Sequence, residues 1–221
     1  MRRSRRAVWL ASAVTFLVGS PGLMPLPATA ESVSFKMLSN YSRATFKTDA
    51  PLETIVGTTA GPGVSGSLTL DLAKPQTATG VIRVDLTTVN SGVAKRDADM
   101  RGADYLDTAN EANRYAVFEV KGVEIASPLE PGKESQARVR GVLTIKGKSV
   151  ERLVDARVTY LRLTPQELEN YKRFGYTEDV LRVRAKFDTA FTNHGMKVPQ
   201  LLLFKVSNDI QLETDLTLVR Q

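Results

Sequence analysis

The chain has 221 residues, with 30 lysines and arginines against 24 aspartates and glutamates, which gives a formal net charge of +6. It contains no cysteine, so disulfide bonds and thiolate chemistry are excluded. Four of the arginines and no acids lie in residues 1–30, so residues 31–221 carry only 26 − 24, or +2. No block of basic residues interleaved with aromatics occurs there, and nucleic-acid binding is therefore disfavoured.

Residues 1–30 have the composition of a secretory signal peptide. A basic start is followed by the apolar run 7–18, by prolines and by the small residues Ala28-Thr29-Ala30, so cleavage is expected before Glu31. The apolar run is too short to span a bilayer, which argues against a membrane anchor. Ser4-Arg5-Arg6 also resembles a twin-arginine signal, so the export route stays open. The sequence predicts one mature domain, residues 31–221, in the periplasm or secreted.

Period-two alternation of apolar and polar residues dominates the mature region. It is clearest at residues 181–191 and 210–218 and recurs at 82–86 and 139–145. Each of these segments is typical of a strand with one buried face and one wet face. Such clean alternation favours antiparallel over parallel sheet.

Further strands are predicted at residues 43–48, 65–72, 115–125 and 151–163, which brings the total to about eight or more. Turns that contain glycine or proline separate the strands; they are expected at residues 57–66, 74–75, 128–132 and 147–148. About eight antiparallel strands in one domain indicate a sandwich or an up-and-down barrel.

Two segments break the strand pattern. Residues 164–167, Thr-Pro-Gln-Glu, are typical of a capping box with proline at the first helical position, and Gly175 is a natural stop. The short helix at 164–175 is expected to dock on the sheet through one face, which carries Leu168, Tyr171 and Phe174. Residues 91–113 show no strand pattern and are predicted to form a helix or an ordered loop.

Charge is most concentrated in residues 95–107, just before the strand at 115–125. Asp97-x-Asp99 could begin a calcium loop, but the next alternating position is a cation and no suitably spaced glutamate closes the loop. No metal site is therefore predicted. The favoured interpretation is a network of charges that pair with each other and order the loop; its expected members are Arg96, Asp97, Asp99, Arg101 and Asp104.

Other candidates for chemistry have simpler explanations. His194 is the only histidine, so a serine-type triad or a zinc site would depend on it alone, and a histidine in a turn is the preferred interpretation. Gly147-Lys148-Ser149 mimics the end of a phosphate-binding loop, but Val142 stands where the motif needs glycine. Strands flank this tripeptide, which indicates a hairpin turn. No catalytic residue is predicted, and the chain is not expected to be an enzyme.

The apolar interior is the remaining candidate for function. In a sandwich, the inward residues of the two sheets meet and fill the core. In an eight-stranded barrel, the same residues can line a cavity for one small ligand. Alternation alone does not separate these two cases.

Several stretches in order carry a family resemblance: Ser42-Arg-Ala-Thr-Phe46, Gly66-Ser-Leu-Thr-Leu-Asp71, Arg96-Asp-Ala-Asp-Met-Arg101, Asp104-Tyr-Leu-Asp107, Tyr115-Ala-Val-Phe118, Gly141-Val-Leu-Thr-Ile-Lys-Gly147 and residues 209–217. Together they resemble the YceI-like family of exported, lipocalin-like, polyisoprenoid-binding bacterial proteins, over nearly all of residues 33–219. Asp99 and Lys146 stand where the family often has histidine, so no role of those histidines carries over. The helix at 164–175 resembles an insertion that could cover one barrel end.

The resemblance implies an all-β fold, an antiparallel eight-stranded lipocalin-like barrel with one or two short helices. It implies a long isoprenoid lipid, such as a quinone or a polyprenyl compound, as the ligand, and no required cofactor. Arg96 and Arg101 are expected to stabilise a loop that shapes the lipid's entrance. Alternation predicts which residues bind the ligand: Ile82, Val84, Leu86, Phe118, Leu143, Ile145, Leu181, Val183, Phe187 and Phe191.

The expected function is to hold the isoprenoid for storage, transport or sensing, with transient membrane contact. The alternative is an envelope stress-response or interaction module with a filled barrel and no small-molecule ligand. A continuous apolar cavity would favour the first function, and a packed interior with an exposed apolar patch would favour the second. The identity of the ligand and the oligomeric state, a dimer included, stay open.

Overall fold

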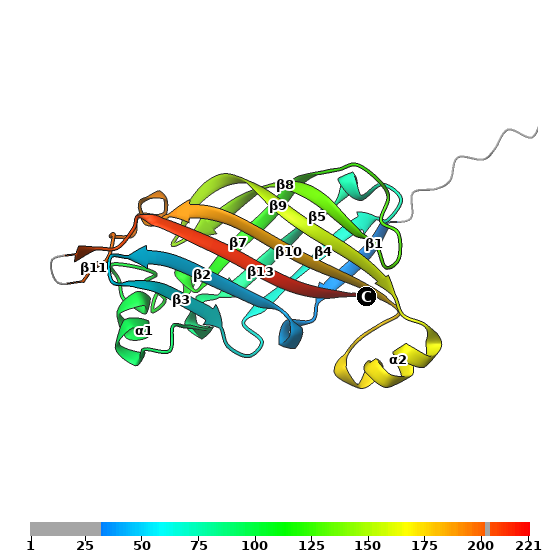
Figure 1. Ribbon diagram of the computed structural model, residues 1–221, viewed down its shortest axis with the longest axis horizontal. Coiled ribbons are helices and arrows are strands. Elements are labelled where there is room, and N and C mark those ends of the chain that lie inside the picture. Colours follow the sequence, from blue (N-terminus) through cyan, green and yellow to red (C-terminus); the bar gives the residue numbers. More distant parts are fainter. Residues whose placement is uncertain (1–31, 202–203) are drawn as a thin grey trace, which may run out of the picture.

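Eight strands close into an antiparallel barrel in the computed structural model, which describes residues 32–201 and 204–221 (Figure 1). The ring closes because the first strand pairs with both the second and the last. This confirms the predicted lipocalin-like barrel; its strands are β1 (Ser32–Met37), β4 (Val64–Asp71), β5 (Thr79–Asp85), β7 (Tyr115–Ile125), β8 (Glu134–Ile145), β9 (Lys148–Arg162), β10 (Asp179–Ala190) and β13 (Asp209–Arg220).

Three further strands extend the wall at one end: β2 (Arg43–Ala50), β3 (Glu53–Thr59) and β6 (Val89–Asn90). The last residues of β13 pair with β1, whereas its first half pairs with β2, so β1 and β2 follow one another along the same neighbour. β3 and β4 continue one another in the same way, along β2 and β1. The barrel is therefore an up-and-down meander in which two of the long strands are interrupted.

The first interruption is stabilised by a buried serine. η1 (Ser39–Tyr41) separates β1 from β2, and beside it the Ser42 hydroxyl accepts a hydrogen bond from the Thr217 amide of β13 at 3.1 Å. The same hydroxyl lies 3.1 Å from the Leu38 carbonyl, to which it donates. A buried amide without a partner would cost free energy, so the Ser42 side chain replaces the missing carbonyl of the broken strand.

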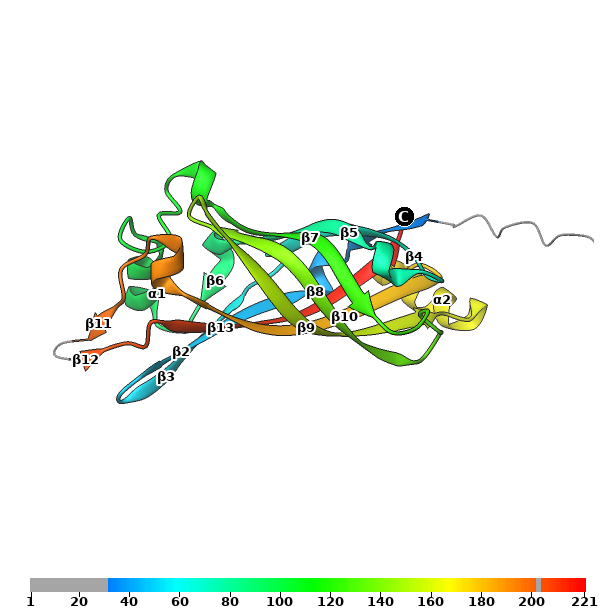
Figure 2. The same ribbon diagram turned by 90° about the horizontal axis from the view of Figure 1, so that it is seen from above.

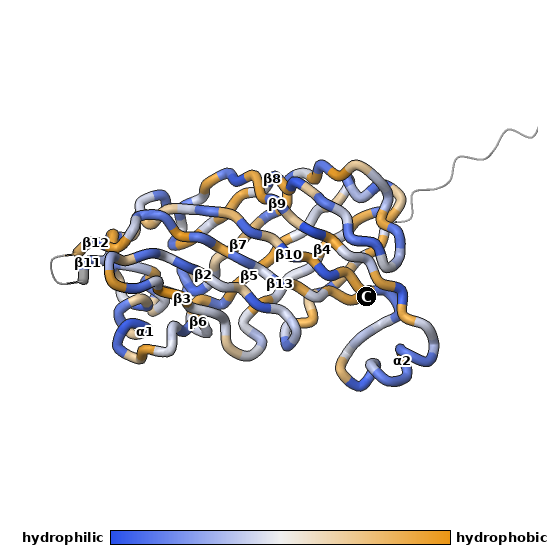
Figure 3. The backbone as a smooth tube through the Cα atoms, in the orientation of Figure 1, coloured by the Kyte–Doolittle hydropathy of each residue, from blue (hydrophilic) through white to orange (hydrophobic). Residues whose placement is uncertain are grey.

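Hydrophobic and hydrophilic residues follow one another along the strands, which Figure 3 shows as changes of colour along the tube. The apolar side chains of the alternating strands are the ones buried inside the barrel. The buried side chains form two clusters. One contains Phe35, Leu181 and Leu218, and the other contains Leu143, Ile145 and Ile210. Phe118 and Val84 pack against both clusters, so the two parts of the core are joined in the middle of the barrel.

The turn predicted at residues 57–66 is present but shorter than predicted. β3 runs through Gly57 to Thr59 and β4 begins at Val64, so the connection is only residues 60–63. Gly57 stands opposite Phe46 in the β2–β3 pair, and a Cβ atom there would lie 2.2 Å from the ring of Phe46. Glycine here therefore permits a close approach of an aromatic ring to a strand and does not mark a turn. The expected hairpin turn at 147–148 is confirmed, with Lys146 and Gly147 both in the left-handed region (φ 49 and 68).

The two helices lie at opposite ends of the barrel, as Figures 1 and 2 show. α1 (Ala94–Arg101) occupies the segment that was predicted as helix or ordered loop. α2 (Pro165–Tyr171) has the predicted capping box: the Thr164 hydroxyl accepts from the Glu167 amide and the Glu167 carboxylate accepts from the Thr164 amide, at 2.8 Å. Gly175 ends the following η5 turn (Lys172–Phe174) with a φ of 89.

The predicted docking of the short helix on the sheet is wrong. α2 has no buried residue. Its segment instead forms a loose group of edge-on and tilted aromatic contacts at 5.4–6.5 Å between ring centroids, which involves Tyr41, Tyr171, Phe174 and Tyr176. The apolar face of a seven-residue helix is too short to fix it on the barrel, and aromatic contacts with η1 hold it instead.

A buried carboxylate ties β9, β10 and β13 together at the α2 end. Asp179 accepts a hydrogen bond from the Tyr160 hydroxyl at 2.6 Å and from the Arg220 guanidinium at 2.8 Å. Burial alone would raise the pKa of Asp179, but these two hydrogen bonds together with the charges of Arg162 and Arg220 outweigh burial and lower it. Burial and the bond to Asp179 together raise the pKa of Tyr160 to about 12, so the phenol stays protonated and the network is fully satisfied.

Replacing Asp179 with asparagine should lower the free energy of unfolding by about 2 kcal/mol at pH 7, because two charge-assisted bonds weaken. Since the pKa of Asp179 is lowered by folding, its contribution is present above the unfolded value of about 3.9 and is lost as the pH falls through the folded value. The difference between wild type and Asp179→Asn in urea unfolding should therefore shrink between pH 6 and pH 3. Asp215→Asn, which disrupts an exposed pair with Arg182, should have a much smaller effect at pH 7; an equal effect would contradict the role of burial.

Candidate functional site

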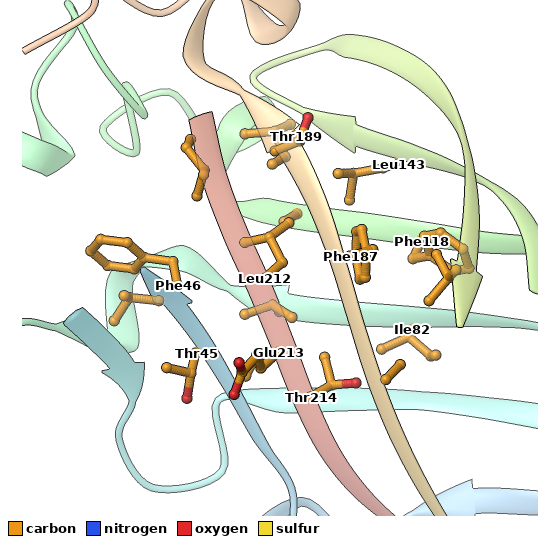
Figure 4. Close-up of a pocket in the computed structure, with 18 of the residues that line it drawn as sticks. Thr45, Phe46, Ile82, Phe118, Leu143, Phe187, Thr189, Leu212, Glu213 and Thr214 are labelled. Carbon is orange, nitrogen blue, oxygen red and sulfur yellow. The ribbon is translucent and has the colours of Figure 1, made fainter. Parts of the chain in front are cut away.

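The barrel encloses an apolar cavity of about 550 Å³. Figure 4 shows side chains from opposite walls pointing into it, among them Phe46, Ile82, Phe118, Phe187 and Leu212. Its volume lies within the range of small-molecule sites, about 300–1,000 Å³. An apolar cavity of this kind offers water few hydrogen bonds, so it favours a hydrocarbon over solvent.

Small inward residues leave the space unfilled. Most inward positions carry larger side chains, but each of the four strands β7, β8, β9 and β10 contributes one alanine to the cavity wall: Ala116, Ala137, Ala156 and Ala185. Eight strands give an interior just wide enough for side chains to fill or for one ligand to occupy. The small volume of alanine at these positions therefore leaves space for a cavity.

All the residues that alternation predicted as ligand-binding lie on the cavity wall: Ile82, Val84, Leu86, Phe118, Leu143, Ile145, Leu181, Val183, Phe187 and Phe191. Phe118 of β7 and Phe187 of β10 face each other across the interior, with ring centroids 5.9 Å apart and planes tilted by 47°. Several of these side chains, such as Val183 and Phe187, are only partly buried although they point inward, because they border open space. Their contact with a ligand stays a prediction.

Strand alternation missed the wall residues that come from loops and helices. Pro75 and Leu129 line the end near α2, and the other end is lined by Val93, Met100, Tyr105, Met196 and Pro199. No period of two marks such positions, because each lies in a loop or a short helix whose place is set by tertiary contacts. None of the residues 165–175 lines the cavity, so α2 does not form part of its wall.

Charged residues reach the cavity at the α1 end, which we call the mouth: Lys95, Arg96 and Asp99 belong to its lining. The Arg96 guanidinium donates to both carboxylate oxygens of Glu53 in β3, at 2.9 and 3.0 Å, and Lys95 pairs with Asp99 at 3.0 Å. The mouth thus carries paired charges around the opening of an apolar interior.

The expected members of the charge network form their bonds with residues outside that set, so the predicted pairing is wrong: Asp99 pairs with Lys95, and the other four bind segments outside residues 95–107. Arg101 donates to the Val89 carbonyl at 2.7 Å. Asp97 is buried and accepts from the Ser91 hydroxyl and amide, at 2.7 and 2.8 Å, which lowers its pKa. Within the set, the charges of Arg101 and Arg96 help to lower the pKa of Asp97. Asp104 pairs with Lys197 at 2.9 Å. These bonds hold α1 and its loop against β3, β6 and residue 197.

His194 lies in the turn η6 (Phe191–His194) that follows β10, as expected, but it is fully buried. Its Nδ1 lies 3.1 Å from the Lys148 carbonyl, which can only accept, so Nδ1 carries the proton and Nε2 accepts from the Thr189 hydroxyl at 2.8 Å. Burial lowers the pKa of His194 and keeps the ring neutral. Both ring nitrogens are used in structural bonds that link β10 to the start of β9.

Within residues 32–201 and 204–221, no group of three or more histidine, cysteine, aspartate or glutamate side chains could hold a metal ion. In the same part of the chain, no helix has the length and apolar character that a bilayer crossing requires.

Comparison with known proteins identifies the domain. Residues 34–218 match the YceI-like domain, in agreement with the resemblance found in the sequence. No curated protein matches the chain in sequence.

Solved structures from three bacteria share the fold. BcnA of Burkholderia cenocepacia has a TM-score of 0.59 and 16% identity, covering 80% of this chain and 95% of BcnA. A polyisoprenoid binding domain from Saccharophagus degradans has a TM-score of 0.62 and 14% identity, covering 86% of this chain and 99% of that domain. The YceI protein of Campylobacter jejuni has a TM-score of 0.56 and 15% identity, covering 75% and 84%.

Thermal stability should depend on His194 in acid. Because folding lowers the pKa of this histidine, its stabilising contribution is complete above the unfolded value of about 6.5 and is lost as the pH falls below it. The melting temperature should therefore decline between pH 7 and pH 5. In a His194→Gln variant, which removes the only histidine, melting should be lower at pH 7 and change less over this interval. An unchanged decline would assign it to other groups.

Arg101→Ala should lower the free energy of unfolding by about 1–2 kcal/mol, because the Val89 carbonyl loses a charged donor. It should also reduce loading of any ligand taken up at the mouth, since α1 loses its bond to β6. Lys95→Ala in the same helix removes only an exposed pair and should change stability little. Unaltered stability and loading in Arg101→Ala would refute a loop-ordering role for this residue.

Proposed function

The chain belongs to the YceI-like family, and we propose that it is an exported protein that holds a long isoprenoid lipid in its barrel. The ligand would be a quinone or a polyprenyl compound, bound for storage, transport or sensing. The observation that carries this proposal is the apolar cavity of about 550 Å³ inside a closed barrel. The polyisoprenoid binding domain from Saccharophagus degradans, which has the same fold, supports this class of ligand.

The energetics of such a cavity favour a hydrocarbon chain. Burial of a CH₂ group contributes about 0.8 kcal/mol, from which the cost of ordering the chain must be subtracted. The branched methyl groups of an isoprenoid suit an uneven apolar wall in which a few alanines stand among larger side chains, because dispersion contacts require close packing. No hydrogen-bonding group on the ligand is needed along most of this wall.

The proposed role is binding rather than catalysis. His194, the only histidine, is committed to Lys148 and Thr189, and the charged residues at the mouth are paired with each other or with Glu53. Such groups are suited to shaping a cavity, whereas an enzyme needs acid, base or nucleophile directed at a substrate.

Export is the second part of the proposal. It rests on the basic, apolar and small-residue succession in residues 1–30, which lie outside the described residues. A protein exported in this way would work in the periplasm or outside the cell and would meet its ligand at a membrane, through transient contact. Mass spectrometry of the protein recovered from a host's extracellular and periplasmic fractions should find Glu31 at the N-terminus.

Native mass spectrometry and organic extraction of the purified mature protein test the main proposal. A bound lipid, or uptake of an isoprenoid quinone supplied in detergent, is expected. A preparation that carries no lipid and takes up neither a quinone nor a polyprenol would refute it.

Val183→Asp and Phe187→Asp should abolish loading, since each places a carboxylate in the apolar cavity, where its desolvation costs several kcal/mol. Ala185→Phe fills the same space without a charge and should reduce loading through volume alone, which covers the case in which a charged variant does not fold. Leu153→Asp is the matched control, because Leu153 is exposed on β9. Equal loading by wild type and both aspartate variants would remove these residues from the site.

A further inference from the structure

Apolar side chains project into solvent around the mouth of the cavity. Leu52, in the turn between β2 and β3, is 83% exposed. Val93, just before α1, and Phe204, the first residue of β12 (Phe204–Lys205), are each 46% exposed. We call these three residues the rim. Exposed apolar residues that gather in one place mark an interaction surface.

The segments that carry the rim are fastened to each other. The Arg96–Glu53 pair joins α1 to the residue that follows Leu52. The Ser207 amide donates to the Asp49 carbonyl at 2.7 Å, which joins the chain after β12 to the end of β2. The Lys197 amide donates to the Asp104 carbonyl at 3.0 Å, which connects the chain before β11 (Gln200–Leu201) to the loop after α1. Figures 1 and 2 both place these segments at the end of the barrel opposite α2.

The rim is continuous with the cavity. Val93 belongs to both, since it is exposed and also lines the cavity. Pro199 and Gln200, which lead into the hairpin that carries Phe204, line the cavity as well. A ligand that passes through the mouth would therefore move between rim side chains.

The charges near the rim do not favour anionic partners. Three cations at the mouth have a carboxylate beside them: Lys95 with Asp99 at 3.0 Å, Arg96 with Glu53 at 2.9 Å and Lys197 with Asp104 at 2.9 Å. Lys205 stands next to Phe204 as a further cation, so most of the charge near the rim is balanced locally. Locally balanced charge gives little long-range attraction to a charged surface. The partner is therefore recognised through apolar contact.

We propose that the rim inserts into a lipid bilayer, so that an isoprenoid passes from the acyl region into the cavity without crossing water. This inference rests on the proposed function for its purpose, because a membrane-resident cargo must leave a bilayer to enter the barrel. Side chains on separate tips suit the loosely packed interface of a bilayer, where each can bury its own surface. Transfer through such contact avoids exposing the hydrocarbon chain to solvent.

Flotation of the mature protein with phosphatidylcholine vesicles that contain no quinone tests docking by itself. Wild type should float with the vesicles. Leu52→Asp and Phe204→Asp should each bind the vesicles about tenfold more weakly, because the burial of one large apolar side chain contributes enough free energy for such a factor. Two controls introduce the same charge elsewhere: Leu153→Asp on the barrel side, where the leucine is 47% exposed, and Phe174→Asp at the α2 end. Both should bind like wild type.

Salt and cargo provide the further readouts. Binding should change little between low and high salt, and transfer of an isoprenoid quinone between vesicles should slow in the rim variants while uptake of the quinone from detergent micelles stays as in wild type. Wild type that does not float, rim variants that float equally well, or binding that requires anionic lipid and disappears in salt would each overturn the inference. Failure to take up quinone from micelles, with rim-dependent flotation intact, would count against the proposed function alone.

Discussion

The structure depends on one constraint: its sheet, in which apolar and polar residues alternate, closes into a barrel whose inward side chains are too small to fill it. In a closed barrel every second residue must point inward, and the number of strands sets how much volume those residues have to fill. Large side chains such as Phe35, Leu181 and Leu218 fill part of the interior, whereas single alanines on β7, β8, β9 and β10 leave space along the cavity wall. The cavity forgoes packing contacts that a filled core would make. A hydrocarbon ligand would restore those contacts, which links the stability of the barrel to its occupancy.

The mouth is formed where two long strands of the barrel are interrupted, between β1 and β2 and between β3 and β4. Because β1 gives way to β2 and β4 follows β3 after a short connection, the β2–β3 hairpin is not held in the β1–β4 pairing and reaches past the barrel wall beside α1 (Figure 1). Ser42 makes this break tolerable by binding the Thr217 amide. Arg96 then fixes the hairpin to α1 through Glu53. One buried hydroxyl and one ion pair thus contribute to the arrangement of the open end of the barrel.

The sequence was sufficient for seven of the eight barrel strands and for the inward faces of the cavity, because a period of two is a local property of each segment. It missed β1, the short strand that closes the ring. It failed at β3, where Gly57 suggested a turn while its real role, to admit the ring of Phe46, depends on a partner strand. It also failed for the charge cluster. The partners Glu53 and Lys197 lie far from the cluster in the chain, Val89 binds through its backbone carbonyl, and nearer charges made a plausible network. Whether the interior is filled or hollow depends on the total volume of the inward side chains, which alternation does not measure. The inward alanines were a sequence signal for a cavity that could have been counted.

The two ends of the barrel differ in what they offer to an amphiphilic ligand. At the α2 end the polar groups are already committed, since Asp179 accepts from both Tyr160 and Arg220. At the α1 end the lining contains Lys95, Arg96 and Asp99, and their exposed pairs can exchange partners at little cost. Burying a polar head in the apolar middle would cost several kcal/mol. A lipid in this cavity is therefore expected to keep its head at the mouth, with its tail directed toward α2. To reach this orientation from a bilayer, the tail must enter the barrel first and the head must leave the bilayer last. This order of entry requires the lipid chain to bend at the rim.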